Sequence, residues 1–111
     1  MTAIWYQVSD LASARRFYTE QLGFREAYFD EEDRWARLER GSIEVALAEG
    51  RQDQVDEEAI ATLDVPNLKK EAERLRAAGV EVGVVVEIPG TIRLLDVFDP
   101  DGNRIQLSED I

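Results

Sequence analysis

The side chains that could do chemistry in this chain are carboxylates, amides and aromatic rings, because the sequence contains neither histidine nor cysteine. This removes the commonest metal ligand and general base, the thiolate nucleophile, and every catalytic pattern built on them. Any reaction would depend on carboxylates, tyrosines, lysines or a metal ion held by carboxylates. We therefore assign no catalytic residue. Since disulfides are also excluded, we expect a cytoplasmic protein.

Several of the polar side chains alternate with apolar residues. In "RIQLS" (104–108), the polar residues share one face of a strand and Ile105 and Leu107 share the other. The same alternation in other segments predicts a set of ligand-binding side chains: Trp5, Gln7, Glu44, Ala46, Ile60, Thr62, Asp64, Arg104, Gln106 and Ser108. Such a mixture of apolar surface and a few polar groups is typical of a small-molecule site. The facing of Trp35, Arg37 and Asp96 is ambiguous from the pattern.

The elements that must position these residues occur in the same order twice. Periodicity and turn residues predict strands at 3–8, 24–30, 34–40 and 42–48 with a helix at 11–22, then strands at 60–65, 80–87, 91–98 and 103–108 with a helix from 67 to 79. "VSDL" (8–11) also resembles "VPNL" (65–68). We therefore predict one α+β domain, residues 1–111, made of two βαβββ modules (1–48 and 58–111) that form a cleft and are joined by a linker at 49–57.

The composition indicates a globular, acidic protein. Hydrophobic residues make up 44% of the chain, and 24 acidic against 13 basic residues give a formal charge of −11. A field of this sign repels nucleic-acid phosphates and anionic lipids and attracts cations. No apolar run is long enough for a membrane span, and we expect no signal peptide. We thus predict a small-molecule ligand, with a cation favoured, and neither nucleic acid nor membrane as a partner.

Four segments together resemble the vicinal oxygen chelate superfamily of glyoxalases, extradiol dioxygenases and bleomycin-resistance proteins. They are "VSDLASARRFYTEQLGF" (8–24), "GSIEVALAEG" (41–50), "VPNLKKEAERLRAAGVEV" (65–82) and "FDPDGNRIQLSE" (98–109). The resemblance implies paired βαβββ modules around a cleft, often in homodimers. In family enzymes, His and Glu side chains from the strands hold a divalent metal ion in this cleft.

The metal-ligand positions of that family fall on Ala3, Glu44, Ile60 and Gln106. Alanine and isoleucine donate nothing and a neutral glutamine donates weakly, so only Glu44 keeps a charged oxygen. We therefore expect no metal ion and no other cofactor. "DPDGN" (99–103) is interpreted as a turn, because a calcium-binding EF-hand loop would need glycine where Arg104 stands.

The leading hypothesis is a metal-free protein that binds, and by analogy with the bleomycin-resistance branch sequesters, a cationic or aromatic drug or metabolite. One alternative is a metal-dependent lyase, isomerase or dioxygenase of the same superfamily with a non-standard site. Another is a degenerate member that acts as an interaction or regulatory module. We also expect a homodimer, because paired modules leave sheet edges that a second copy can cover.

Overall fold

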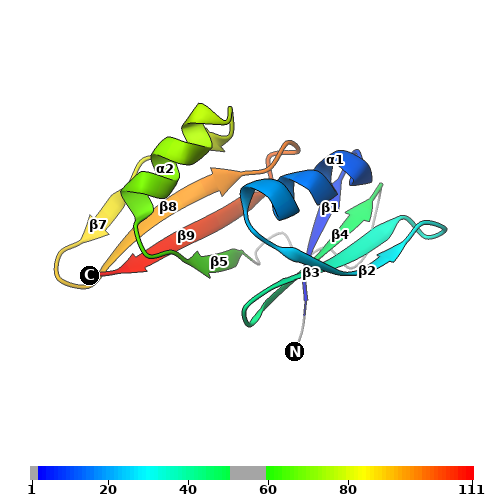
Figure 1. Ribbon diagram of the computed structural model, residues 1–111, viewed down its shortest axis with the longest axis horizontal. Coiled ribbons are helices and arrows are strands. Elements are labelled where there is room, and N and C mark those ends of the chain that lie inside the picture. Colours follow the sequence, from blue (N-terminus) through cyan, green and yellow to red (C-terminus); the bar gives the residue numbers. More distant parts are fainter. Residues whose placement is uncertain (1–2, 51–59) are drawn as a thin grey trace. The chain divides into compact units, whose positions relative to one another are not determined.

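The computed structural model describes residues 3–50 and 60–111. The chain divides into two compact units, residues 1–59 and 60–111. In each unit a helical segment lies on one face of its own sheet (Figure 1). The predicted α+β class and the repeated βαβββ order are confirmed, whereas the cleft between modules and their assembly into one domain stay predictions. The sheet face away from the helix is called the helix-free face below.

Unit 1 contains a four-stranded sheet in the order β1-β4-β3-β2, with β1 and β4 parallel and the other pairs antiparallel. Its elements are β1 (Ile4–Val8), α1 (Leu11–Arg16), the π-helical segment η1 (Phe17–Gln21), β2 (Arg25–Asp30), β3 (Trp35–Arg40) and β4 (Ile43–Glu49).

Unit 2 repeats this arrangement with the sheet order β5-β9-β8-β6, and β7 also pairs with β8. Its elements are β5 (Ala61–Asp64), α2 (Leu68–Ala77), β6 (Glu81–Val82), β7 (Val86–Ile88), β8 (Ile92–Phe98) and β9 (Arg104–Asp110). The strands β5 and β9 are parallel, as β1 and β4 are in unit 1.

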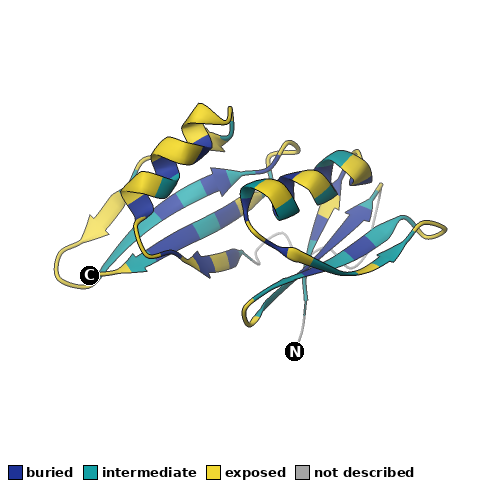
Figure 2. Cartoon of the chain, viewed as in Figure 1, coloured by how far each residue is buried: buried dark blue, intermediate teal, exposed yellow. Residues whose placement is uncertain are grey.

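The core of each unit lies between its helix and its sheet. The apolar positions predicted for the first helix are all buried: Leu11, Ala14, Phe17, Tyr18 and Leu22. Tyr18 contacts the rings of Tyr6 and Phe24, with centroids 6.2 and 5.7 Å apart. In unit 2 the buried side of α2 faces alternate residues of the strands, which gives the banded burial in Figure 2. Burial of these stripes is the main force that holds each helix to its sheet.

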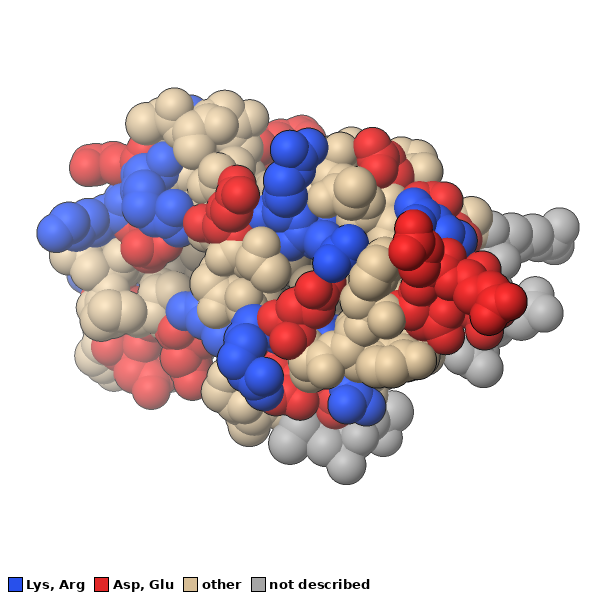
Figure 3. Space-filling model, turned by 45° about the vertical axis from the view of Figure 1, so that its right-hand side comes forward, with Lys and Arg blue, Asp and Glu red and all other residues tan. Residues whose placement is uncertain are grey.

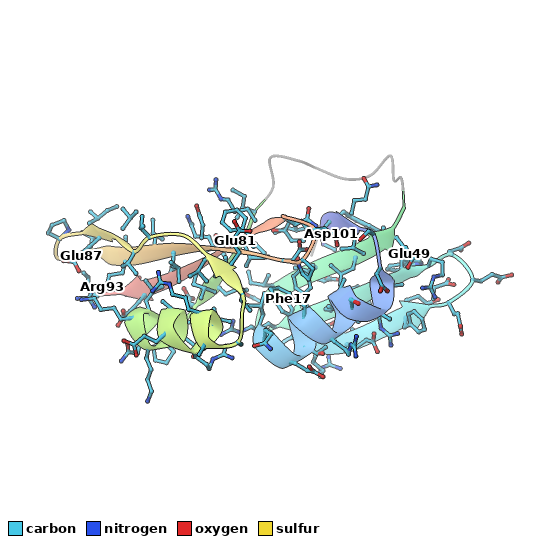
Figure 4. All side chains as sticks on the ribbon, turned by 90° about the horizontal axis from the view of Figure 1, so that it is seen from above. Phe17, Glu49, Glu81, Glu87, Arg93 and Asp101 are labelled. Atoms are coloured by element: carbon cyan, nitrogen blue, oxygen red, sulfur yellow. The ribbon has the colours of Figure 1, made fainter. Side chains whose placement is uncertain are left out.

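Both units fix the first turn of the helix with the same device. The side chain of Glu49, at the end of β4, accepts a hydrogen bond from the backbone N–H of Leu11 (2.9 Å) and pairs with Arg34 (2.9 Å). Glu109, on β9, accepts from the N–H of Leu68 (3.1 Å) in the same way. Figure 4 shows Glu49 beside the start of α1. A carboxylate at a helix N-terminus satisfies a free donor and complements the helix dipole.

The structure corrects three boundaries of the predicted elements. The helix predicted at 11–22 leaves α geometry at Phe17, where the hydroxyl of Thr19 donates to the carbonyl of Arg15 (2.8 Å). The strand predicted at 80–87 is two short strands, because the pairing with β8 shifts by one residue between Val82 and Val86. The linker predicted at 49–57 loses Glu49 to β4, and its residues 51–57 lie outside the described part.

The turn predicted at 99–103 is confirmed. The N–H of Gly102 donates to the carbonyl of Asp99 (2.9 Å), and the buried Asp99 side chain accepts from the N–H groups of Asp101 and Asn103. The carboxylate of Asp99 is thus engaged inside the turn. Among the described residues, no helix is both long and apolar enough to cross a membrane.

Candidate small-molecule site

The helix-free face of unit 1 carries the largest group of side chains suited to a ligand. Strand register places residues of four strands together on this face: Trp5 and Gln7 from β1, Glu44, Ala46 and Ala48 from β4, Trp35 and Arg37 from β3, and Tyr28 from β2. It thus holds the predicted residues of this unit and settles the facing of Trp35 and Arg37. All three aromatic side chains outside the core packing of Tyr6, Phe17, Tyr18 and Phe24 and the Arg15-covered Phe29 belong to it.

These rings, called the aromatic row, run across the sheet from Trp5 through Trp35 to Tyr28. The ring centroids of Trp5 and Trp35 are 5.4 Å apart, and those of Trp35 and Tyr28 are 5.1 Å apart. Both pairs are tilted, at 34° and 50°. These separations lie in the favourable range for aromatic pairs. The row therefore presents neighbouring π surfaces from three strands, on which a planar group can stack.

Small residues beneath the rings make the contact between the tryptophans possible. The strands β1 and β3 flank β4, so their backbones are roughly 10 Å apart, twice the spacing of adjacent strands. The two indoles must lean toward each other over β4 to come within 5.4 Å. Ala46 pairs with Trp5 and Ala48 with Trp35, and both alanines are fully buried. A larger side chain at either position would occupy the space that the rings need.

A charged pair lies beside the row. The Nε of Arg37 is 3.2 Å from Oε1 of Glu44, and the Glu44 side chain is only 16% exposed against 43% for Arg37. The Arg37 Nε is itself buried and makes no well-aligned hydrogen bond within the described residues. The distance thus defines an ion pair, while the angle is poor for a hydrogen bond. Arg37 offsets much of the negative charge that Glu44 brings to this face.

The other end of the row is acidic. The hydroxyl of Tyr28 lies 3.4 Å from a carboxylate oxygen of Asp30. The negative charge of Asp30 raises the pKa of Tyr28 above its ordinary value, with smaller contributions from partial burial, the hydrogen bond to Asp30 and the charge of Asp33. A phenolate is disfavoured where the potential is negative, and a cation is favoured there for the same reason. The exposed end of the row therefore suits a positively charged group.

The helix-free face of unit 2 is polar and its charges are paired. The hydroxyl of Ser108 donates to Asp64 (2.9 Å), and Arg104 Nε lies 3.3 Å from Asp96 Oδ1. Gln106 pairs with Thr62 on one side and Asp96 on the other. This places Asp96, whose facing was ambiguous, among the predicted residues of this unit. Ile60 is half-buried and precedes β5.

Sequence reasoning missed Tyr28 because the alternation of β2 is interrupted. A register irregularity lies between Glu26 and Tyr28. Before it, Glu26 faces the helix and binds Arg15; after it, Phe29 does, with the Arg15 guanidinium 3.7 Å from its ring centroid. Counting by two from the buried Phe24 would place Tyr28 in the core. The bulge turns it to the helix-free face instead. The exposure of Tyr28 has no signal in the sequence pattern alone.

Comparison with known proteins identifies the family. The sequence profile of the Glyoxalase/Bleomycin resistance protein/Dioxygenase superfamily matches residues 2–107, so the chain belongs to this superfamily. A curated relative, 3-methylcatechol 2,3-dioxygenase of Pseudomonas putida, is 28% identical over 109 residues, which cover 92% of this chain and 36% of the relative. The chain thus spans about a third of that enzyme's length.

Solved structures share the fold. The fosfomycin resistance protein FosX of Listeria monocytogenes superimposes with a TM-score of 0.81 at 18% identity, covering 100% of this chain and 93% of FosX. TnmS3, an antibiotic binding protein of a Streptomyces species, gives a TM-score of 0.76 at 22% identity, covering 100% and 97% of the two chains. At these identities the likeness shows the fold alone.

The four positions that the family uses for metal do not suit a metal ion here. Ala3 directly precedes the pair Ile4–Val45 and so lies beside Glu44, while Ile60 stands two residues before Thr62, the partner of Gln106. Glu44 is the sole anionic donor among the four, and its carboxylate contacts Arg37. Within the described residues no three carboxylates gather in a group that could hold a metal ion. One engaged carboxylate and a neutral amide cannot replace the water shell of a divalent ion.

Proposed function

We propose that this protein binds a planar aromatic, cationic small molecule without a metal ion, on the aromatic row of unit 1. The observation that carries the proposal is the contact of Trp5, Trp35 and Tyr28 over the buried alanines of β4. Tryptophan and tyrosine faces attract planar rings and cations, each contact contributing roughly 0.5–1 kcal/mol at exposed sites. The ligand belongs to the class of drugs or metabolites that such a protein could sequester.

The charge of the protein favours a cationic ligand over an anionic one. The chain carries a formal charge of −11, and Asp30 and Asp33 lie near the Tyr28 end of the row. Figure 3 shows one face of the molecule, on which acidic side chains gather at one end and basic side chains lie among acidic ones elsewhere. Arg37 is paired with Glu44, so it offers less to an anion than a free guanidinium would.

Intrinsic fluorescence tests the proposal directly, because both tryptophans of the chain belong to the row. We expect the planar cation proflavine to quench this fluorescence saturably, and the planar anion anthracene carboxylate to bind at least about tenfold more weakly, since tenfold is about 1.4 kcal/mol. Trp35→Leu should weaken proflavine binding by a similar factor. Thr62→Ala, on the helix-free face of unit 2, is the matched control. Absence of binding, or equal loss in the control, would contradict the proposal.

The relation to a catechol dioxygenase supports one alternative, a metal-dependent enzyme with a non-standard site. Elemental analysis of untagged protein distinguishes the two functions. The proposed function requires less than stoichiometric metal. A stoichiometric metal ion that is lost on Glu44→Ala would favour the enzyme.

A further inference from the structure

The outer edge of unit 2 exposes apolar side chains. Within the described part of the chain, β7 pairs with β8 and with no other strand. Val84, Val86 and Ile88 are 78%, 52% and 49% exposed, while Val85 between the first two is half-buried. An edge strand presents free backbone N–H and C=O groups, and proteins usually protect such edges with charges. This edge is left apolar, which indicates an interaction surface.

The edge is also the part of an acidic chain where a second copy meets least repulsion. Residues 82–92 contain one charged residue, Glu87, in a chain of formal charge −11. The Glu87 carboxylate lies 2.7 Å from Nε of Arg93, and the two side chains lie together on neighbouring strands in Figure 4. Because Arg93 offsets this charge, the edge carries little net charge of its own.

The sequence of the edge is self-complementary in one antiparallel register. With Val86 opposite the partner's Val86, Val84 faces the partner's Ile88, so all three exposed apolar side chains meet apolar neighbours. Glu87 then faces the partner's Val85. A register centred on Glu87 would instead oppose two carboxylates, which is unfavourable. Pro89 has no N–H and ends the pairing after Ile88.

We propose that a second copy of this chain pairs antiparallel with β7 along its outer edge, in a register centred on Val86. The inference does not depend on the proposed ligand. It assigns the dimer surface to the edge of unit 2 and leaves the aromatic row of unit 1 outside the contact.

Disulfide trapping tests the register, and the chain is suited to it because it has no cysteine. Under mild oxidation Val86→Cys should form a covalent dimer by itself, since the residue opposes its own copy. Val84→Cys and Ile88→Cys should each cross-link poorly alone and efficiently when mixed. Gln7→Cys, on the helix-free face of unit 1, is the control. Preferential cross-linking through Gln7→Cys, or equal cross-linking at all positions, would overturn the proposal.

Association in solution gives an independent test. Sedimentation velocity of the full chain at tens of micromolar should show a dimer, and Val86→Lys should raise its dissociation constant at least about tenfold, because two like charges then meet at the two-fold axis. Ala77→Lys, an exposed position on α2, adds the same charge and should leave the dimer intact. A monomeric wild-type chain, or a dimer weakened equally by both substitutions, would refute the β7 interface.

Discussion

The two units share their helix-side construction and differ on their helix-free faces. Each helix begins with a side-chain cap, Asp10 in unit 1 and Asn67 in unit 2, and each first turn is held by a glutamate from the last strand of the same unit. The opposite faces have little in common. Unit 1 presents the aromatic row, whereas unit 2 presents a serine–aspartate hydrogen bond and an arginine–aspartate pair.

This difference separates the residues that build the fold from those available for function. The capping contacts satisfy backbone donors that would be costly to leave unpaired, so both units need them. Residues on the helix-free face have no such obligation. That face can therefore carry stacked rings in one unit and polar pairs in the other without a change of topology.

The largest expected effect comes from enlarging the residue beneath the aromatic row. Ala46→Leu should destabilise the protein by about 1–3 kcal/mol, because the fully buried site has no room for the added carbons. Gln106→Leu, at the half-buried strand position that pairs with Thr62, should change stability by only about 0.5 kcal/mol. Urea unfolding of both variants measures the contrast. Equal effects would show that the two faces are packed alike.

Removing the charge of the capping glutamates should have a smaller effect that is unequal between units. Glu49→Gln leaves Arg34 without its carboxylate partner, whereas after Glu109→Gln Arg93 still pairs with Glu87. We therefore expect Glu49→Gln to lower the urea midpoint more than Glu109→Gln does. The reverse order would mean that the N-terminal contact, which both share, outweighs the arginine pair.

The pH dependence of Glu49 sharpens this comparison. The hydrogen bonds from Arg34 and from the N–H of Leu11 lower the pKa of Glu49 below its ordinary value of 4.5. A lowered pKa in the folded state means that this carboxylate adds stability above pH 4.5, and that the contribution is lost as the pH falls through the folded-state pKa. The stability difference between wild type and Glu49→Gln should thus shrink in acid. A difference that stays constant from neutral to acidic pH would exclude this origin.

The smallest effect concerns the acidic end of the aromatic row. Asp30→Asn removes the charge that contributes most to the raised pKa of Tyr28, so this pKa should fall toward its ordinary value of 10. Ultraviolet absorbance of the phenolate follows it, with Tyr28→Phe identifying the signal among the three tyrosines. An unchanged titration would show that the row does not feel the charge of Asp30.

Local signals in the sequence predicted much of the fold. Asp10, Gly23, Asn67 and Gly79 delimit the helices through capping and left-handed geometry, and alternation correctly assigned the two faces of β1, β4, β5 and β9. The site was predictable in part, since Trp5 and Glu44 were placed on one face. The contact of Trp5 with Trp35 was not, because it depends on strand order and on the lean of both rings over β4. The bulge that exposes Tyr28 and the break between β6 and β7 are set by pairing with neighbouring strands.

The central claim is that the aromatic row of unit 1, rather than the polar face of unit 2, receives a ligand. Heteronuclear NMR tests it most directly, because the chain gives only two indole N–H signals. On addition of proflavine, both indole signals should shift along one saturable curve while the side-chain amide of Gln106 stays in place. Saturable shifts of Gln106 with unmoved indole signals would contradict the account.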